Sequence, residues 1–72
     1  MEDFKRVLKV ISLRFRIERI KQRLSQEKFV EIANVHTNYI SKVERGEQNL
    51  TVKKIVELTN SLNIPISNII GI

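Results

Sequence analysis

Hydrophobic residues recur at helical spacing along the start of the chain, on two sides of one predicted helix. No Gly or Pro interrupts the segment from Asp3 to Arg23, so we expect a single long helix there. One apolar stripe consists of Phe4, Leu8, Ile11 and Phe15, and the other consists of Val10, Leu13, Ile17, Ile20 and Leu24. A helix that is apolar on nearly opposite sides is either sandwiched within its own domain or shared with another subunit.

Two short helices are predicted next, with a tight turn between them. Ser25 is a good N-cap for the first of these, and Asn34 ends it because Asn tolerates the left-handed conformation. The following helix is expected from about Thr37 to Arg45, where Gly46 provides the C′ residue that commonly ends a helix.

The remainder of the chain predicts two further helices. Thr51 is expected to cap a helix that runs through Leu62, and Ser67 to cap a final short turn from Asn68 to Ile70. The inner face of the longer helix is predicted to consist of Ile55, Leu58 and Leu62. No segment has the pattern of a strand. The predicted fold is all-α: a compact five-helix bundle, with residues 1–72 as a single domain.

The composition excludes several kinds of function. The chain has no Cys and one His, so we expect no disulfide, no cysteine nucleophile, no metal site and no cofactor. No carboxylate pair or glycine loop is spaced for catalysis, so we do not expect an enzyme. No apolar run reaches bilayer length and no secretory signal is evident, so we expect no membrane association and a cytoplasmic protein.

The charge suggests a polyanionic partner but does not locate its surface. The net charge is +5, and residues 5–28 hold nine Lys or Arg against two Glu. The positive excess therefore lies mainly on the first helix. A basic ridge on that helix consists of Lys5, Lys9, Arg16, Arg19 and Arg23. Such a ridge is either a solvated face or a surface that contacts phosphates.

The two short central helices have the arrangement of a helix-turn-helix, which places its second helix in the DNA major groove. Ile40 and Val43 point inward at helical spacing. The exposed edge provides the candidates for base contacts: Thr37, Asn38, Ser41 and Lys42. Asn pairs with adenine, Thr offers a methyl group to thymine, and Lys reaches guanine acceptors. Double-stranded DNA is therefore the expected partner.

Several short sequence motifs across nearly the whole chain resemble those of the phage-repressor (Cro/Xre-type) helix-turn-helix family. They are Leu24-Ser25-Gln26-Glu27, Tyr39-Ile40-Ser41, and Glu44-Arg45-Gly46 followed by Asn49. With Asn49-Leu50-Thr51, the pattern looks most like the controller proteins of restriction–modification systems. The resemblance implies a dimeric, single-domain regulator of its own operon and of the nuclease gene.

The sequence departs from that family at three positions. Val30 stands where Ala is usual at the helix crossing, which predicts slightly wider packing. Asn34 replaces the usual Gly in the turn, and Arg23 replaces the Gly that separates the first two helices.

The resemblance, together with the anion-attracting start of the second helix, implies a set of DNA backbone contacts. These residues are Gln26, His36, Tyr39, Arg45, Gln48 and Asn49. For His36 the alternatives are local capping and a pH switch, because it is the only group that titrates near neutrality. For Tyr39 the alternative is packing of the ring under the helix. The resemblance also places Arg19 where it would pair with Glu44. That pair would neutralise an acid on a surface that approaches phosphates.

The end of the chain is rich in isoleucine, which suggests self-association. Ile64, Ile66, Ile69 and Ile70, with Ile72 beyond them, have little chain left to cover them. We expect a two-fold dimer, which would bind an inverted-repeat operator. No room is left for a small-molecule effector. The alternative function is a protein-interaction module, the antitoxin of a toxin–antitoxin pair that binds its partner through the first helix or the tail.

Overall fold

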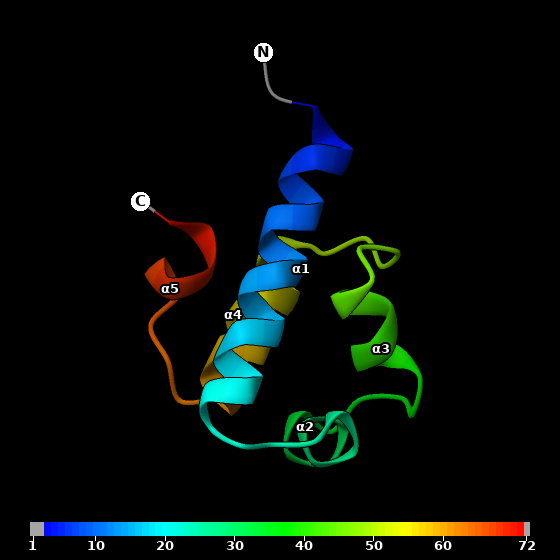
Figure 1. The fold of residues 1–72 in the computed structure, drawn as a ribbon, viewed down its shortest axis with the longest axis vertical. Coiled ribbons are helices and arrows are strands. Elements are labelled where there is room, and N and C mark those ends of the chain that lie inside the picture. Colours follow the sequence, from blue (N-terminus) through cyan, green and yellow to red (C-terminus); the bar gives the residue numbers. More distant parts are fainter. Residues whose placement is uncertain (1–2, 72) are drawn as a thin grey trace.

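The computed structural model describes residues 3–71, and this part of the chain contains helices and no strand. The five helices are α1 (Phe4–Lys21), α2 (Gln26–Ala33), α3 (Tyr39–Glu44), α4 (Val52–Ser61) and α5 (Ser67–Ile70). Figure 1 shows the long α1 crossing in front of α4, with α3 and α5 on opposite sides of α1 and α2 beneath them. The all-α, five-helix prediction is confirmed. No helix among residues 3–71 is both long and apolar enough to cross a bilayer.

Side-chain caps begin the three longest helices. Asp3, Ser25 and Thr51 each accept a hydrogen bond from a backbone N–H in the first turn, at 3.0–3.1 Å. The caps predicted at Ser25 and Thr51 are therefore confirmed. The cap predicted at Ser67 is wrong, because Ser67 is already the first residue of α5 and no side chain caps that helix.

Left-handed residues end all five helices, with Gly71 (φ 49°) at the end of α5. Arg23, Asn34, Gly46 and Asn63 have φ between 54° and 73°. After each, the next residue donates its N–H five positions back, at 2.9–3.2 Å. This is the hydrogen bond of the Schellman motif, which turns the chain sharply after a helix. Asn34 and Gly46 were predicted in this role, whereas Arg23 adopts the conformation despite its side chain.

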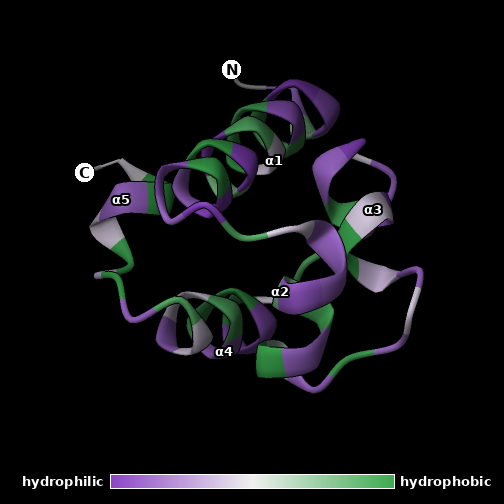
Figure 2. Ribbon diagram, turned by 60° about the horizontal axis from the view of Figure 1, so that its bottom comes forward, coloured by the Kyte–Doolittle hydropathy of each residue, from purple (hydrophilic) through white to green (hydrophobic). Residues whose placement is uncertain are grey.

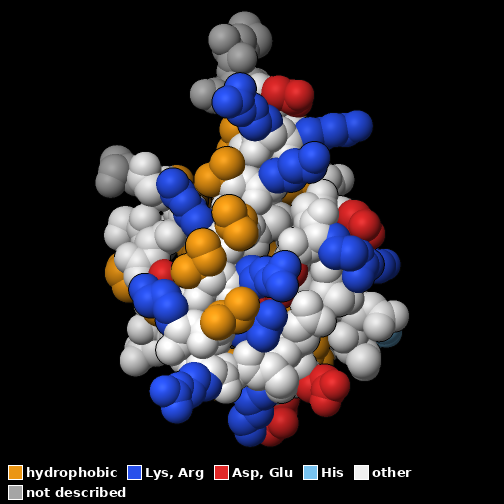
Figure 3. Space-filling model, viewed as in Figure 1, with side chains coloured by type: hydrophobic (Ala, Val, Ile, Leu, Met, Phe, Trp, Pro, Cys, Tyr) orange, Lys and Arg blue, Asp and Glu red, His pale blue; other side chains and the backbone are white. Residues whose placement is uncertain are grey.

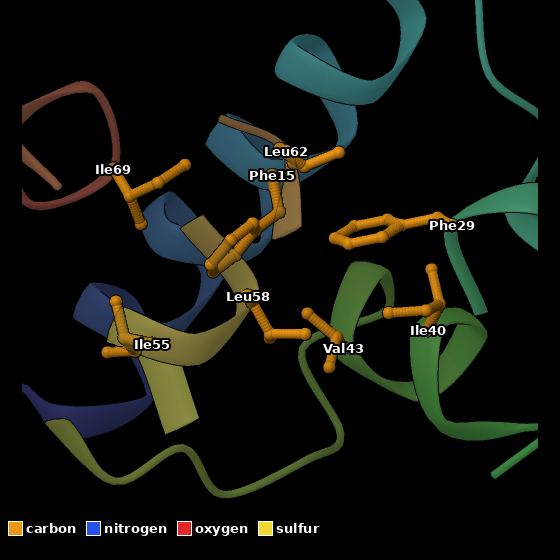
Figure 4. Close-up of a cluster of buried hydrophobic side chains, with 8 residues drawn as sticks. All are labelled: Phe15, Phe29, Ile40, Val43, Ile55, Leu58, Leu62 and Ile69. Atoms are coloured by element: carbon orange, nitrogen blue, oxygen red, sulfur yellow. The ribbon is translucent and has the colours of Figure 1, made fainter. Parts of the chain in front are cut away.

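One hydrophobic core joins all five helices. Figure 4 shows its eight side chains directed toward one another: Phe15, Phe29, Ile40, Val43, Ile55, Leu58, Leu62 and Ile69. The rings of Phe15 and Phe29 lie 6.4 Å apart in a tilted arrangement. The predicted inner face of α4 is confirmed, because Ile55, Leu58 and Leu62 are all buried.

The two stripes of α1 have different environments. On the inner stripe Leu8 and Phe15 are buried, but Phe4 is 63% exposed because the first turn of α1 extends past the other helices (Figure 1). On the outer stripe Leu24 packs against the core. The other four members are exposed to solvent: Val10, Leu13, Ile17 and Ile20. Hydrophobic residues thus recur along α1 well beyond what the core requires (Figure 2). Because its outer stripe is exposed, α1 is not sandwiched between other parts of the described subunit.

Candidate nucleic-acid interface

A buried ion pair holds the helix-turn-helix against α1. The Arg19 guanidinium donates two hydrogen bonds to Glu44, with Nε–Oε2 and Nη2–Oε1 distances of 2.7 and 3.0 Å. The side chains are only 12% and 3% exposed. This two-bond arrangement is the most directional that Arg and a carboxylate form. The predicted pair of Arg19 with Glu44 is confirmed.

Two further contacts extend this pair into a network. Nη1 of Arg19 donates to the carbonyl of Leu24 at 2.7 Å, which ties the α1–α2 turn to the same guanidinium. Nε2 of Gln26, the first residue of α2, donates to Oε1 of Glu44 at 3.0 Å. The Arg19–Glu44–Gln26 network therefore links α1, α2 and α3. The role of Gln26 in this network could not be predicted from the sequence, because the contact depends on how α2 crosses α3.

The turn before α3 is stabilised by His36. Its carbonyl accepts the Tyr39 N–H at 2.9 Å, and its Nδ1 lies 3.4 Å from the Asn38 N–H. Asn38 has helical backbone angles but no side-chain cap bond. The helix therefore begins at Tyr39, two residues later than expected. His36 thus stabilises the turn, but its side chain does not cap α3; its contact with DNA stays a prediction.

The structure brings the four candidate base-contacting residues to one polar edge around the start of α3. Thr37 and Asn38 lie in the turn, and Lys42 lies one helical turn further on; all three are exposed. Ser41 is half-buried, and its hydroxyl donates to the Asn38 carbonyl at 2.9 Å. On the inner side of the same helix, Ile40 and Val43 are fully buried. The edge is thus free to meet a ligand, while the helix beneath it is fixed.

Tyr39 divides its side chain between the core and the surface. The ring packs against the core, and Nζ of Lys54 lies 5.6 Å from its centroid. Burial raises the pKa of the Tyr39 hydroxyl above its usual value, so the phenol stays protonated at neutral pH. A hydrogen bond to Glu57 raises the pKa of Lys54, which therefore stays cationic beside the ring. The packing alternative for the ring is observed, and it leaves the hydroxyl able to donate a hydrogen bond.

The loop after α3 carries the remaining predicted backbone contacts. Arg45 is exposed and forms a two-bond pair with Glu47, at 3.1 and 3.2 Å. Gln48 is half-buried and Asn49 is exposed in the same loop. Since exposed ion pairs contribute little to stability, the pairing with Glu47 leaves Arg45 able to turn toward a phosphate.

The C-terminal isoleucines do not form one surface. Ile69 is fully buried, so it belongs to the core of the subunit and cannot contribute directly to a surface patch. Ile64, Ile66 and Ile70 are partly exposed around it, and Ile72 lies outside the described residues. The predicted patch is therefore reduced to three side chains.

The sequence matches the helix-turn-helix family over residues 15–69. The chain belongs to the Cro/Xre-type helix-turn-helix family. This is a family of DNA-binding regulators, and α2 and α3 are its helix-turn-helix. No curated protein matches the sequence.

Solved structures support the membership. The restriction-modification controller protein C.AhdI from Aeromonas hydrophila is 28% identical, with a TM-score of 0.86, and the match covers 94% of this chain and 99% of that one. The controller protein C.Esp1396I is also 28% identical, with a TM-score of 0.79 and coverage of 89% and 80%. A hypothetical transcription factor from Neisseria, NHTF, is 21% identical with a TM-score of 0.85 and covers 97% and 80%; it supports the fold alone.

Residues 3–71 contain no cluster of three or more His, Asp or Glu side chains that could hold a metal ion. The arrangement is a rigid polar edge on a basic protein, which suits recognition of a duplex by contact.

Proposed function

We propose that the chain is a homodimeric, sequence-specific transcriptional regulator that binds inverted-repeat operators, one of them in its own promoter. Its context would be a restriction–modification system or a mobile element, in the cytoplasm. The observation that carries the proposal is the exposed edge of α3 on a helix that the Arg19–Glu44 pair fixes from behind. Near full-length similarity to controller proteins points the same way.

Base reading is assigned to the edge of α3. Asn38 and Thr37 lead into the helix, and Ser41 and Lys42 follow on its exposed side. The N-terminal part of a recognition helix is the part that reaches base edges in the major groove. Phosphate contacts around the edge come from Gln26, His36, Tyr39, Arg45, Gln48 and Asn49. They would fix the register of the protein on the duplex without reading sequence.

Dimerisation is assigned to the partly exposed isoleucines near the C-terminus, Ile64, Ile66 and Ile70. Ile69 lies behind them and supports them from the core. A symmetric dimer would read two half-sites about one helical turn apart, roughly 34–36 Å. With no effector expected, the response would depend on the concentration of the protein itself.

The test is selection of bound duplexes from random DNA, followed by footprinting on the promoter of the gene. We expect an approximate inverted repeat, protected by the purified protein alone. Asn38→Ala should reduce this preference, whereas the substitution Asn60→Ala, at an exposed asparagine on α4, should leave it unchanged. Absence of any enriched sequence would reject the proposal.

Sedimentation tests the assembly separately. Ile66→Asp with Ile70→Asp should give a monomer that binds half-sites weakly. The matched control is Leu13→Asp, which places the same charge on the exposed apolar face of α1. If only the Leu13 variant became monomeric, the dimer interface would lie on α1 instead.

A second candidate function is the antitoxin of a toxin–antitoxin pair, and the exposed outer stripe of α1 favours it. Purification separates the two. A soluble dimer that footprints on its own promoter favours the regulator. A chain that is insoluble or monomeric without the product of a neighbouring gene favours the antitoxin.

A further inference from the structure

Helix α1 exposes an apolar stripe that neither the core nor the helix-turn-helix uses. Val10, Leu13, Ile17 and Ile20 are 45%, 56%, 46% and 52% exposed. In Figure 3 hydrophobic side chains form a row down the middle of the molecule along α1, bordered by blue cations. Helix α3 lies to one side of α1 (Figure 1), so an occupant of the row on α1 would leave the polar edge of α3 accessible.

The spacing of the stripe is that of a coiled-coil seam. Its members follow one another at steps of three, four and three, which are the a and d positions of a heptad. At 100° per residue the stripe covers an arc of roughly 80°, narrower than the face of at least about 100° that a helix usually buries against a core. A stripe this narrow matches one partner helix better than a broad surface.

The residues that border the seam are all cationic. In the same heptad, the two flanking rows (positions g and e) are Lys9, Arg16 and Arg23 on one side and Arg14 and Lys21 on the other. Nη1 of Arg14 donates to the Ile69 carbonyl at 3.0 Å, which holds its guanidinium group against α5. Within residues 3–71 no carboxylate lies within 4.0 Å of Lys9 or Arg16. Lys9 and Arg16 are therefore available to a partner, whereas Lys21 already pairs with Glu18 at 3.3 Å.

The flanking charges select the chemistry of the occupant. In coiled coils the e and g residues decide partner choice through salt bridges. A second copy of α1 would bring cations against cations in either orientation, and like charges in register are unfavourable. An anionic lipid surface would attract the cations, but interfacial helices present a wide apolar face. A partner helix with apolar a and d positions would pack against the seam, and acidic residues at its e and g positions would pair with the bordering cations.

We propose that α1 is a docking surface for a partner helix with apolar residues at a and d positions and Asp or Glu at the flanking positions. This interaction is separate from DNA binding and does not depend on it. The seam from Val10 to Ile20 is about 15 Å long. Because an interface of this length is small, we expect transient binding, with a Kd on the order of micromolar. Since α1 is already folded, only the partner would have to become ordered.

The test uses two synthetic peptides of about four heptads, with identical apolar positions and either Glu or Lys at every e and g position. Fluorescence anisotropy of the labelled peptide, titrated with the full chain, gives the affinity. We expect the Glu peptide to bind at least about tenfold more tightly than the Lys peptide, and its affinity to fall with salt.

Three variants make the test specific to the seam. Ile17→Ser should weaken binding of the Glu peptide by about tenfold or more, because it removes a central apolar contact. The control Val52→Ser, at a 70% exposed valine on α4, should not change it. Lys9→Glu combined with Arg16→Glu should reduce the preference for the Glu peptide. Circular dichroism confirms that each variant is folded.

Several results would overturn the proposal. They are no binding of either peptide, equal binding of both, or unchanged affinity in Ile17→Ser. Binding to phosphatidylglycerol vesicles through Ile17 without binding of the Glu peptide would make the stripe a lipid surface. Loss of the dimer in Ile17→Ser would make it a contact between copies of the chain.

Discussion

The inner and outer sides of α3 differ in almost every physical respect. On the inner side Ile40 and Val43 are fully buried, and Glu44 is held by Arg19. On the outer side Thr37, Asn38 and Lys42 are exposed, and their side chains are not used by the fold. The inner side determines where the helix stands, and the outer side determines what it contacts. Substitutions on the two sides should therefore separate stability from recognition.

The largest effect is expected in the core beneath the helix. Phe29→Ala removes a fully buried ring that packs near Phe15, and should lower the free energy of unfolding by about 3–5 kcal/mol. A domain of this size has a total stability of only several kcal/mol. Chemical denaturation should show a largely unfolded protein. If Phe29→Ala stayed folded and lost only its binding to operator DNA, the assignment of stability to the inner residues and recognition to the outer residues would be contradicted.

The ion pair should show the next largest effect. Arg19→Met leaves Glu44 buried without its partner, which should cost about 3 kcal/mol. The double variant Arg19→Met with Glu44→Gln removes the orphaned charge and should recover part of that loss. Urea unfolding of the two single variants and the double variant measures the coupling. Additive losses would mean that the two side chains do not stabilise the fold as a pair.

The outer side should give losses of recognition at nearly constant stability. Asn38→Ala and Thr37→Ala should each weaken operator binding by about 1–3 kcal/mol, with little change on random DNA. Their melting temperatures should stay close to that of the parent, because surface changes usually alter stability by no more than about 0.5 kcal/mol. Competition binding against random duplex provides the comparison. Equal losses on both DNAs would show that these side chains do not read sequence.

A smaller and less specific effect is expected at Arg45. Arg45→Ala should weaken binding to operator and random DNA alike and reduce the salt dependence by about one ion. The slope of affinity against salt concentration is the measurement. A loss confined to the operator would reassign Arg45 to base reading.

The smallest effect is a gain in stability at the end of α1. Arg23 has a φ of 59°, a conformation that costs a residue with a side chain about 1–2 kcal/mol. Arg23→Gly should relieve most of this strain, but glycine also loses more backbone entropy on folding. The expected net result is a rise in the unfolding free energy of at most about 1 kcal/mol. Asn63→Gly is the control at a residue that tolerates this conformation, and its gain should be smaller. A lower stability in Arg23→Gly would show that the arginine side chain contributes more than its backbone costs.

Local signals in the sequence were enough to predict most helix limits. Ser25 and Thr51 cap helices because a side-chain oxygen satisfies a backbone N–H nearby, and Asn34 and Gly46 end helices because they tolerate a positive φ. These effects involve only neighbouring residues. The start of α3 was predicted too early, because hydrogen bonds accepted by His36 place Thr37 and Asn38 in the turn.

Tertiary placement was harder to predict. Periodicity identified both stripes of α1, but not that Phe4 would extend beyond the bundle or that the outer stripe would stay uncovered. Likewise, composition alone could not separate Ile69, which fills the core, from its exposed neighbours. The ion pair of Arg19 with Glu44 was anticipated through family resemblance, whereas the contact of Gln26 with Glu44 depends on the crossing of two helices.

The burial of the Arg19–Glu44 pair has a practical consequence for measurements on DNA. Dissolved ions screen exposed charges strongly and enclosed ones much less. Raising the ionic strength should therefore detach the protein from a duplex well before it loosens the reading helix. A salt titration can then be interpreted as a count of displaced counterions, without a correction for unfolding.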